Sequence, residues 1–366
     1  MSSSPGRELM DKPIRILIVA PSLRITGGQS VQAARLMDEL RKVPGLEVDF
    51  QAVDPKLPGP LGAIQKIKFV RTMVTESVYL MALLARVWRY DVIHAFSAGY
   101  WSFLLAPTPA ILLGKWFGRK TVLNYRNGTL EDHLQKFPRA VSLMGMADRI
   151  VPPSGFLVEV YKRFGLKSSY IFNIIDTKAF PRRDRSKPAP KFFHNRGMEE
   201  LYNIPCTLRA FAIIQQKYPE ASLRLAHDGP LRPMLEALVR ERGLQNVEFL
   251  GFVDQERMKQ LYDGAEIYLM SPNIDNMPGS ILECYACGLP FVSTAAGGVP
   301  FIVDDGRTGL LVPVNGHEEM AAAALRLLEE AGLAKSLTSA GFRECERYQG
   351  PQVAVQWAEL YRELVS

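Results

Sequence analysis

Apolar runs and amphipathic stretches alternate along the 366-residue chain. Ile14–Ala20 is apolar except for Arg15 and shows no polar alternation, as expected for a central parallel strand buried on both faces. Residues 30–43 then place apolar side chains at helical spacing. Strands and helices that alternate in this way predict the α/β class, with a parallel sheet covered by helices on both faces.

The pattern predicts two such series, one in each half of the chain. In the first half we expect strands at 14–20, 46–53, 91–96, 120–125, 148–151 and 169–172, and helices at 30–43 and 155–164. In the second half we expect strands at 192–195, 222–226, 247–250, 266–270, 290–294 and 310–314, and helices at 205–217, 231–242, 254–263, 280–287, 317–331 and 351–365. Ser154 is the expected N-cap of the helix that begins at residue 155.

Two longer apolar stretches, Val74–Trp88 and Tyr100–Phe117, are expected to be core or peripheral helices. Charged residues and prolines interrupt both, so neither offers the ~20 clean apolar residues that a membrane-spanning helix needs. Residues 1–13 are too polar for a signal peptide. We therefore expect a cytoplasmic protein.

The composition changes at residues 181–191, where prolines and basic residues cluster. Such a segment is typical of a linker, in which Arg182, Arg183 and Arg185 would be solvated rather than form a binding patch. The chain therefore divides into a Rossmann-like domain at 1–178, a linker at 179–190, a second Rossmann-like domain at 191–348, and a helix at 349–366 that packs back on the first domain. Ligands of such sheets bind beyond the carboxyl ends of the strands.

The composition excludes several classes of protein. With 47% hydrophobic and 22% charged residues, the chain is not disordered, collagen-like or a coiled coil. The formal net charge of +6 is weaker than the clustered excess of a dedicated nucleic-acid binder, so no nucleic-acid partner is expected. Four cysteines cannot make a disulfide framework, and the Cys284–Cys287 spacing is expected to be two core residues rather than a metal site.

The strongest chemical signal lies between Ser271 and Pro300. The loop Asp275–Gly279 leads into the helix expected at 280–287, and the backbone N–H groups at such a helix start suit a diphosphate. Glu283, one turn into that helix, could accept two hydrogen bonds from a ribose diol. Taken without their flanking residues, Asp275 and Glu283 would be interpreted as an ordinary acidic residue in a loop and a solvated acidic residue on a helix. Gly297 and Gly298 allow the backbone to approach another segment or a ligand.

This stretch resembles the signature of the family 4 retaining glycosyltransferases, in which E-x7-E precedes A-C-G-x-P and G-G-x-P. Asp275 and Glu283 stand eight residues apart, so the first acid is present as Asp. Weaker matches follow at Asp228-Gly-Pro230, Gly251–Val253, Asp304–Val312, Gly27-Gly28 and Asn173–Asp176. The resemblance covers nearly the whole chain and implies the GT-B fold, two doubly wound Rossmann-like domains that face a central cleft.

The resemblance implies an enzyme that moves a sugar from a nucleotide diphosphate sugar, UDP- or GDP-linked, to an acceptor hydroxyl. The acceptor, a glycan, a lipid or a small molecule, would be bound by the N-terminal domain; the reaction would retain configuration and need no metal or other cofactor. Catalytic roles would fall to Asp275, Glu283, Arg196 and Arg126. The donor would be bound by Gly27, Gly28, Arg196, Asp228, Gly229, Phe252, Val253, Asp275, Asn276, Met277, Gly279, Ser280 and Glu283.

Three departures from the family pattern bear on activity. Arg196 fills the first position of the family's R-x4-K motif, but residues 200–203 hold no Lys. Less charge on the leaving diphosphate would then be neutralised, unless Arg196 bonds both phosphates or another base such as Arg232 reaches the diphosphate. Arg126 stands where the family often has a His. Asp275 is one methylene shorter than Glu, which shifts its contact by about 1 Å, a change that is costly in a catalytic site.

Several alternatives stay open at this point. A catalytically weak nucleotide-sugar-binding protein fits the missing Lys and the Arg126 replacement, and a nucleotide-sugar epimerase with the same fold is a further alternative. Gly27-Gly28 could be an ordinary turn. Lys66, Lys68, Arg71 and Arg86 surround an apolar run, and this segment could be a solvated helix face or a peripheral contact with an anionic membrane at the inner face.

Overall fold

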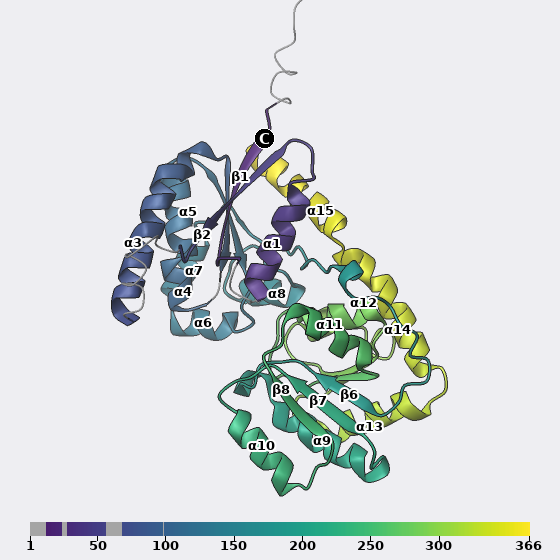
Figure 1. The fold of residues 1–366 in the computed structure, drawn as a ribbon. Coiled ribbons are helices and arrows are strands. Elements are labelled where there is room, and N and C mark those ends of the chain that lie inside the picture. The colour runs from purple at the N-terminus through teal and green to yellow at the C-terminus, as the bar shows by residue number, and fades with distance from the viewer. Residues whose placement is uncertain (1–11, 24–27, 56–67, 98) are drawn as a thin grey trace, which may run out of the picture. The chain divides into compact units, whose positions relative to one another are not determined.

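The computed structural model describes residues 12–23, 28–55, 68–97 and 99–366. The chain forms two compact units (Figure 1). Unit 1 takes the described residues up to Ile174 together with Gly350–Ser366, and unit 2 takes Ile175–Gln349. Gly27 and Lys66, both singled out from the sequence, lie outside the described residues.

Unit 1 is built on a parallel sheet in the strand order β2-β1-β3-β4-β5. The middle of this sheet is dry, because Ile16–Ala20 on β1 have no exposed surface, which explains the unbroken apolar run in the sequence. Order 2-1-3-4-5 is one of the two common doubly wound arrangements. The strands are β1 (Ile14–Ala20), β2 (Leu46–Ala52), β3 (Val92–Ser97), β4 (Lys120–Tyr125) and β5 (Arg149–Ile150).

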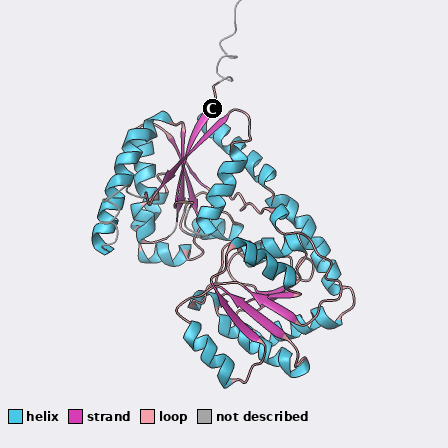
Figure 2. Ribbon diagram, in the orientation of Figure 1, coloured by secondary structure: helices cyan, strands magenta, loops and turns pink. Residues whose placement is uncertain are grey.

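Helices cover both faces of this sheet (Figure 2). On one face, Leu36 of α1 and Trp357 of α15 pack over Ile16 and Ile18 of β1. On the other face, Tyr79 of α3 and Ala110 of α5 pack over Leu17 and Val19. The helices are α1 (Gly28–Leu40), α3 (Lys68–Arg86), α4 (Trp101–Leu105), α5 (Pro107–Trp116), α6 (Leu130–Lys136), α7 (Arg139–Met144), α8 (Gly155–Arg163) and α15 (Gly350–Val365).

Unit 2 has a six-stranded parallel sheet in the order β11-β10-β9-β6-β7-β8. Read along the chain this is the Rossmann order 3-2-1-4-5-6, in which the winding reverses between the first and fourth strands. Its strands are β6 (Lys191–His194), β7 (Ser222–Ala226), β8 (Val247–Gly251), β9 (Ile267–Met270), β10 (Phe291–Thr294) and β11 (Leu310–Val312). Its helices are α9 (Ile204–Lys217), α10 (Arg232–Glu241), α11 (Gln255–Gly264), α12 (Gly279–Cys287), α13 (His317–Glu329) and α14 (Leu333–Glu344).

The element predictions hold for most of the chain and fail at identifiable places. The Ser154 N-cap is confirmed, since its hydroxyl accepts from the Leu157 N–H at 3.3 Å. The strand expected at 169–172 is wrong. Its neighbour β5 is followed by Pro152 and Pro153, which have no N–H to donate, so the ladder cannot continue. Helices α6, α7 and α14 were not predicted.

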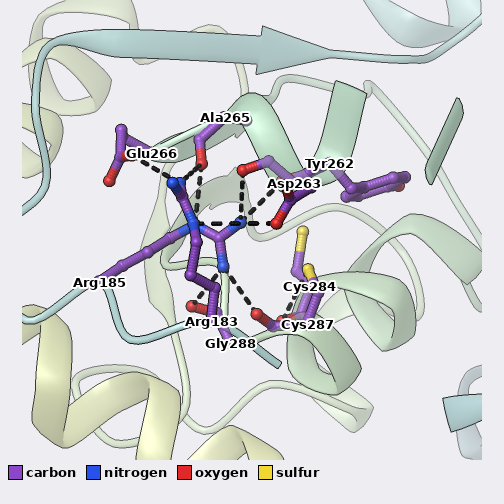
Figure 3. A network of polar contacts seen from close by, with 9 residues as sticks. All are labelled: Arg183, Arg185, Tyr262, Asp263, Ala265, Glu266, Cys284, Cys287 and Gly288. Carbon is purple, nitrogen blue, oxygen red and sulfur yellow. Dashed lines mark hydrogen bonds and ion pairs between the residues drawn. The ribbon is translucent and has the colours of Figure 1, made fainter. Parts of the chain in front are cut away.

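The basic segment at 179–190 differs from the solvated linker that its composition predicts. Arg185 is only 2% exposed and its guanidinium donates to five carbonyl groups of unit 2 (Figure 3). These carbonyls belong to Tyr262, Asp263, Ala265, Cys287 and Gly288, at the carboxyl-terminal ends of α11 and α12. The segment is therefore part of unit 2, and a buried cation joins the ends of two of its helices.

In the described part of the chain, no helix has both the length and the apolar character to cross a bilayer. Helix α15 contacts α1 and β1 of unit 1, although it follows unit 2 in the sequence.

Candidate functional site

Most of the predicted site residues lie where the winding of the unit 2 sheet reverses. Strands β6 and β9 are neighbours in this sheet although two strands separate them in the sequence. The loops that leave their carboxyl ends therefore diverge and leave room for a ligand between them. Asn195 and Arg196 follow β6, and the loop from Ser271 to Pro278 follows β9 and leads into α12.

Arg196 and Asp275 form an ion pair at this place. Arg196 Nη2 lies 2.5 Å from Asp275 Oδ2, and the two side chains are 18% and 11% exposed. The guanidinium also lies 4.3 Å from the ring centroid of Tyr202. Burial is the largest influence and lowers the pKa of Arg196, but the Asp275 charge and the neighbouring tyrosines together outweigh it and raise the pKa. Arg196 is thus a fixed cation with a carboxylate beside it.

The loop that carries Asp275 is held by a glycine pair. The Gly298 N–H donates to the Asp275 carbonyl at 2.7 Å. A Cβ atom at Gly298 would overlap the carbonyl oxygen of Asn276, and one at Gly297 would overlap that of Asp275. Gly297 also has φ +55°, which favours glycine. The prediction that these glycines allow a close backbone approach is confirmed, and the approaching segment is 275–276.

Helix α12 begins directly after this loop. Its N-cap residue is Pro278, which makes no side-chain hydrogen bond to the helix start. A Cβ atom at Gly279 would meet nothing within 4 Å, whereas the Ser280 side chain is buried. The partial positive charge of a helix start therefore adds to the charge of Arg196, which makes this end of α12 suitable for an anion.

Glu283, on the second turn of α12, is held by a chain of three buried side chains. Tyr262 Oη donates to Glu283 Oε2 at 2.6 Å. Asn195 Nδ2 donates to Tyr262 Oη at 2.9 Å, and Tyr268 Oη donates to Asn195 Oδ1 at 2.7 Å. Burial raises the pKa of both tyrosines, so they remain hydroxyl donors. This chain links Glu283 to the residue next to Arg196.

Sequence reasoning missed this chain. Asn195 could have been found, because it is the first residue after a central parallel strand of unit 2. Tyr262 and Tyr268 gave no signal, since aromatic residues on a helix and a strand normally predict core packing. They do lie in the core, but with their hydroxyls directed to the site.

Asp228 and Gly229 lie at the carboxyl end of β7, next to the loop after β6. The Met198 N–H donates to the Asp228 carbonyl at 3.1 Å, and a Cβ atom at Gly229 would overlap the Met198 backbone. The Asp228 carboxylate pairs with Arg232 at 3.0 Å, and Arg232 also pairs with Glu236 at 2.8 Å. Arg232, considered above as a replacement for the missing Lys, is therefore bound to two carboxylates.

Phe252 and Val253 follow β8, the strand beside β7. Phe252 is 78% exposed and its ring centroid lies 6.0 Å from that of His227. His227 has φ +75° and donates its N–H to the Gly251 carbonyl at 2.8 Å. An aromatic ring held in solvent at this edge is suited to stack on a flat ring such as a nucleobase.

Asn276 and Met277 are buried in the loop between β9 and α12. The other two predicted residues, Gly28 and Arg126, belong to unit 1. Gly28 begins α1, where Gln29 Nε2 donates to the Ser97 carbonyl at 3.4 Å, and the Arg126 N–H donates to the same carbonyl at 3.0 Å. The Arg126 guanidinium bonds Asn124 and Asn173 and burial lowers its pKa to about 9. The two residues thus share the carboxyl edge of the unit 1 sheet.

No cluster of three or more His, Cys, Asp or Glu side chains in the described residues is placed to hold a metal ion. Cys284 and Cys287 are buried on α12 as free thiols, and burial raises the pKa of both.

Comparison with known proteins gives a family-model match over part of the chain and a fold for nearly all of it. The family model described as "Glycosyl transferases group 1" matches residues 192–330, within unit 2. Alpha-D-kanosaminyltransferase of Streptomyces kanamyceticus is 30% identical over 159 residues, which cover 43% of this chain and 41% of that protein. Exopolysaccharide phosphotransferase SCO2592 of Streptomyces coelicolor is 32% identical over 334 residues, 90% of this chain and 33% of that protein. The chain thus spans well under two thirds of these relatives.

Solved structures match over the whole length. The sucrose-phosphate synthase of Thermosynechococcus elongatus has a TM-score of 0.76 at 19% identity, over 96% of this chain and 99% of that one. Anabaena Alr3699/HepE, solved in complex with UDP, has a TM-score of 0.75 at 17% identity, over 96% and 100%. The chain has the GT-B fold. This bears out the fold expected from the sequence, and it makes unit 2 the GT-B carboxyl-terminal domain.

Proposed function

We propose that this GT-B protein is a retaining glycosyltransferase of family 4 that uses a nucleotide diphosphate sugar. One observation carries the proposal: Arg196, Asp275, Glu283 and the start of α12 occupy the reversal point of the unit 2 sheet. A fixed cation and a helix start suit a diphosphate, and a fixed carboxylate suits a ribose diol. The family match over 192–330 covers all of these residues.

The proposed roles follow the geometry of unit 2. Glu283, with one oxygen held by Tyr262, would accept from the ribose hydroxyls. Arg196 and the N–H groups at Gly279 and Ser280 would bind the diphosphate, and Phe252 would stack on the base. Asp275 would face the hydroxyls of the donor sugar, and Arg126 and Gly28 would act from unit 1.

The proposed reaction exchanges one bond at the anomeric carbon. The bond to the departing phosphate oxygen breaks, the bond to the acceptor oxygen forms on the same face, and the acceptor proton passes to the departing phosphate oxygen. No protein nucleophile is required. The protein's contribution would be electrostatic, since Arg196 and the α12 start stabilise the charge that develops on the diphosphate, and this supports a metal-independent reaction.

The first test is a thermal-shift and calorimetry screen against UDP, GDP and ADP and their sugars. A ligand present at 100 times its Kd stabilises the fold by about 2.7 kcal/mol. We expect UDP or GDP to bind without added metal, and Glu283→Gln to lose most of the preference for the nucleotide over its 2′-deoxy form. Unchanged preference in Glu283→Gln would remove Glu283 from the ribose site.

A catalytically weak nucleotide-sugar-binding protein is the second candidate. It is favoured by the ion pairs of Arg196 with Asp275 and of Arg232 with Asp228 and Glu236, because these carboxylates reduce the positive charge available to a leaving diphosphate. Nucleotide binding with no sugar released to any acceptor or to water would support it. Conversion of the donor to its epimer without an acceptor would instead support the epimerase alternative.

A further inference from the structure

The tryptophans of this chain are distributed in an unusual way. Three of the four are exposed, Trp88 by 49%, Trp101 by 67% and Trp116 by 79%, whereas Trp357 is 2% exposed. Tryptophan is large and mostly apolar, so it is seldom left in water without a function. Trp101 lies against Phe137, with ring centroids 6.1 Å apart. Trp88 and Trp116 belong to a larger apolar surface.

Helix α3 is apolar on two opposite sides. Its inner side, with Tyr79 and Leu83, has no exposed surface and packs on the unit 1 sheet, as does Val87 just beyond the helix. Its outer side carries a second stripe at helical spacing that is open to solvent. The members of this stripe are Met73, Leu80, Met81, Leu84 and, just beyond the helix, Trp88.

Helix α5 extends this stripe. It contacts α3 and covers the same face of the sheet, and Figure 1 shows the two helices next to each other in unit 1. Its outward residues Leu112 and Trp116, one turn apart, are both exposed. Because α3 leads into β3 and α5 into the adjacent parallel strand β4, Trp88 and Trp116 lie at the same end of the two helices. We call these seven residues the α3–α5 face.

The charge around the α3–α5 face is basic. Residues 68–90 and 107–120 contain seven Lys or Arg and one acid, Glu76. At the tryptophan end, Arg89 lies 5.0 Å from the Trp88 ring, and Lys115, Arg119 and Lys120 surround Trp116 in the sequence. Two of these bases, Arg86 and Lys115, pair with the nearby Asp49 and Asp148, and Asp91 is paired with Arg15. The other bases still leave the face positively charged.

We propose that the α3–α5 face docks onto the surface of a bilayer that contains anionic lipids. Helix α3, with 19 residues and a length of roughly 28 Å, would lie in the plane of the membrane with its outer stripe among the acyl chains. Trp88 and Trp116 would sit at headgroup level, which tryptophan prefers, and the surrounding bases would meet lipid phosphates. The charge complementarity favours this occupant over a second copy of the chain, whose identical face is also basic.

The test uses the full chain, without nucleotide, so that its outcome is independent of the donor site. Vesicles of phosphatidylcholine alone are compared with vesicles of equal parts phosphatidylcholine and phosphatidylglycerol. We expect co-sedimentation with the anionic vesicles, a bound fraction that falls as salt is raised, and a blue shift of tryptophan emission on binding. Absence of binding to the anionic vesicles would overturn the proposal.

Two variants separate the apolar and basic contributions. Trp88→Ser combined with Trp116→Ser should lower the partition coefficient about tenfold or more, and Arg71→Gln combined with Arg89→Gln should abolish the preference for anionic vesicles. Met234→Ser, at a comparably exposed apolar residue on α10 of unit 2, is the control and should bind as wild type. Wild-type binding by the tryptophan variant would contradict the proposal. So would a wild-type dimer that this variant converts to monomer, because the face would then join two copies of the chain.

Discussion

Asp275 limits the charge that Arg196 can offer to a ligand. The two side chains are 2.5 Å apart and mostly buried, so water screens their attraction only weakly. A diphosphate that binds Arg196 must therefore share this cation with Asp275, and the two anions repel each other. In the proposed donor site this carboxylate would lower nucleotide affinity, which fits the role proposed for it toward the sugar rather than the phosphates.

Asp275→Asn should separate these two effects. Removing the negative charge leaves Arg196 entirely to the diphosphate, so the Kd for the nucleoside diphosphate should fall, by about tenfold for a close charge pair that is mostly buried. Transfer should fall at the same time if Asp275 contacts the donor sugar. Calorimetry with the nucleoside diphosphate measures the Kd, and an assay with the nucleotide sugar measures the rate of transfer. Weaker nucleotide binding in Asp275→Asn would mean that Asp275 only positions Arg196.

Tyr262 should affect the preference for a ribonucleotide through its hydrogen bond to Glu283. A hydrogen bond to a charged group contributes roughly 1.5–3 kcal/mol, so Tyr262→Phe should reduce the preference for a ribonucleotide over its 2′-deoxy form about tenfold or more. Tyr285→Phe is the matched control: this tyrosine is also buried, and it lies on α12 itself, but its hydroxyl donates to the Ile302 carbonyl. Equal loss in both variants would indicate a general disturbance of α12 and not a contact specific to Glu283.

At the scale of elements, Arg185 stabilises the pair of helices that carries Tyr262 and Glu283. Its positive charge lies at the carboxyl-terminal ends of both α11 and α12, where helix dipoles favour a cation. Arg185→Met leaves buried carbonyls without a donor and should destabilise unit 2 by about 3 kcal/mol or more. Arg182→Met removes an exposed arginine that lies 4.4 Å from the Phe342 ring, and should cost well under half as much.

Chemical denaturation of unit 2, followed by circular dichroism, measures this difference. Similar losses in the two variants would show that the buried guanidinium adds nothing beyond an exposed one.

The sequence predicted an element well where neighbouring residues specify it, and poorly where it depends on residues far away in the sequence. Ile14–Ala20 and Lys120–Tyr125 were predicted to the residue, because both are short segments with an apolar middle, which reflects burial inside a parallel sheet. Helix α14 and the position of Arg185 were not predicted, since both depend on partners far away in the sequence. A basic, proline-rich segment has the same composition whether its arginines are solvated or donate to carbonyls 80 to 100 residues away.

The candidate site also has a part that the sequence predicted and a part that it did not. Asp275, Glu283 and Gly298 were found because their spacing along one loop and helix is a local pattern. The Arg196–Asp275 ion pair and the Tyr268–Asn195–Tyr262 chain were not, because they join residues from β6, β9, α11 and the following loops. Which residues meet there follows from the strand order, and the sequence gives no direct record of strand order.

At the scale of the whole molecule, each unit buries one neutral histidine on an inner strand. His94 on β3 is fully buried, and burial lowers its pKa to about 3, with the Arg126 charge adding to the effect. His194 at the end of β6 is also fully buried, and burial lowers its pKa to about 3. Its Nδ1–H donates to the Leu269 carbonyl at 2.9 Å. Both rings therefore stay neutral in the folded protein above about pH 3.

These two histidines predict how stability depends on pH. Their folded pKa lies below the unfolded value of about 6.5, so between pH 6.5 and pH 3 the unfolded state binds more protons. The free energy of unfolding should therefore fall as the pH drops from 7 to 5, by roughly 2 kcal/mol for each histidine. His133 and His227, whose pKa values burial also lowers, act in the same direction. Carboxylates with lowered pKa, such as Asp91, affect the pH dependence of the free energy of unfolding only below about pH 4.

The distribution of tryptophan allows the two histidines to be told apart. All four tryptophans lie in unit 1, so their fluorescence follows the unfolding of that unit alone. His94→Gln should flatten the dependence of the fluorescence-detected free energy of unfolding on pH between 7 and 5, and His194→Gln should leave it unchanged if the units unfold separately. Circular dichroism, which follows both units, should respond to both variants. A pH dependence in His94→Gln as steep as in wild type would show that His94 can be protonated in the folded unit.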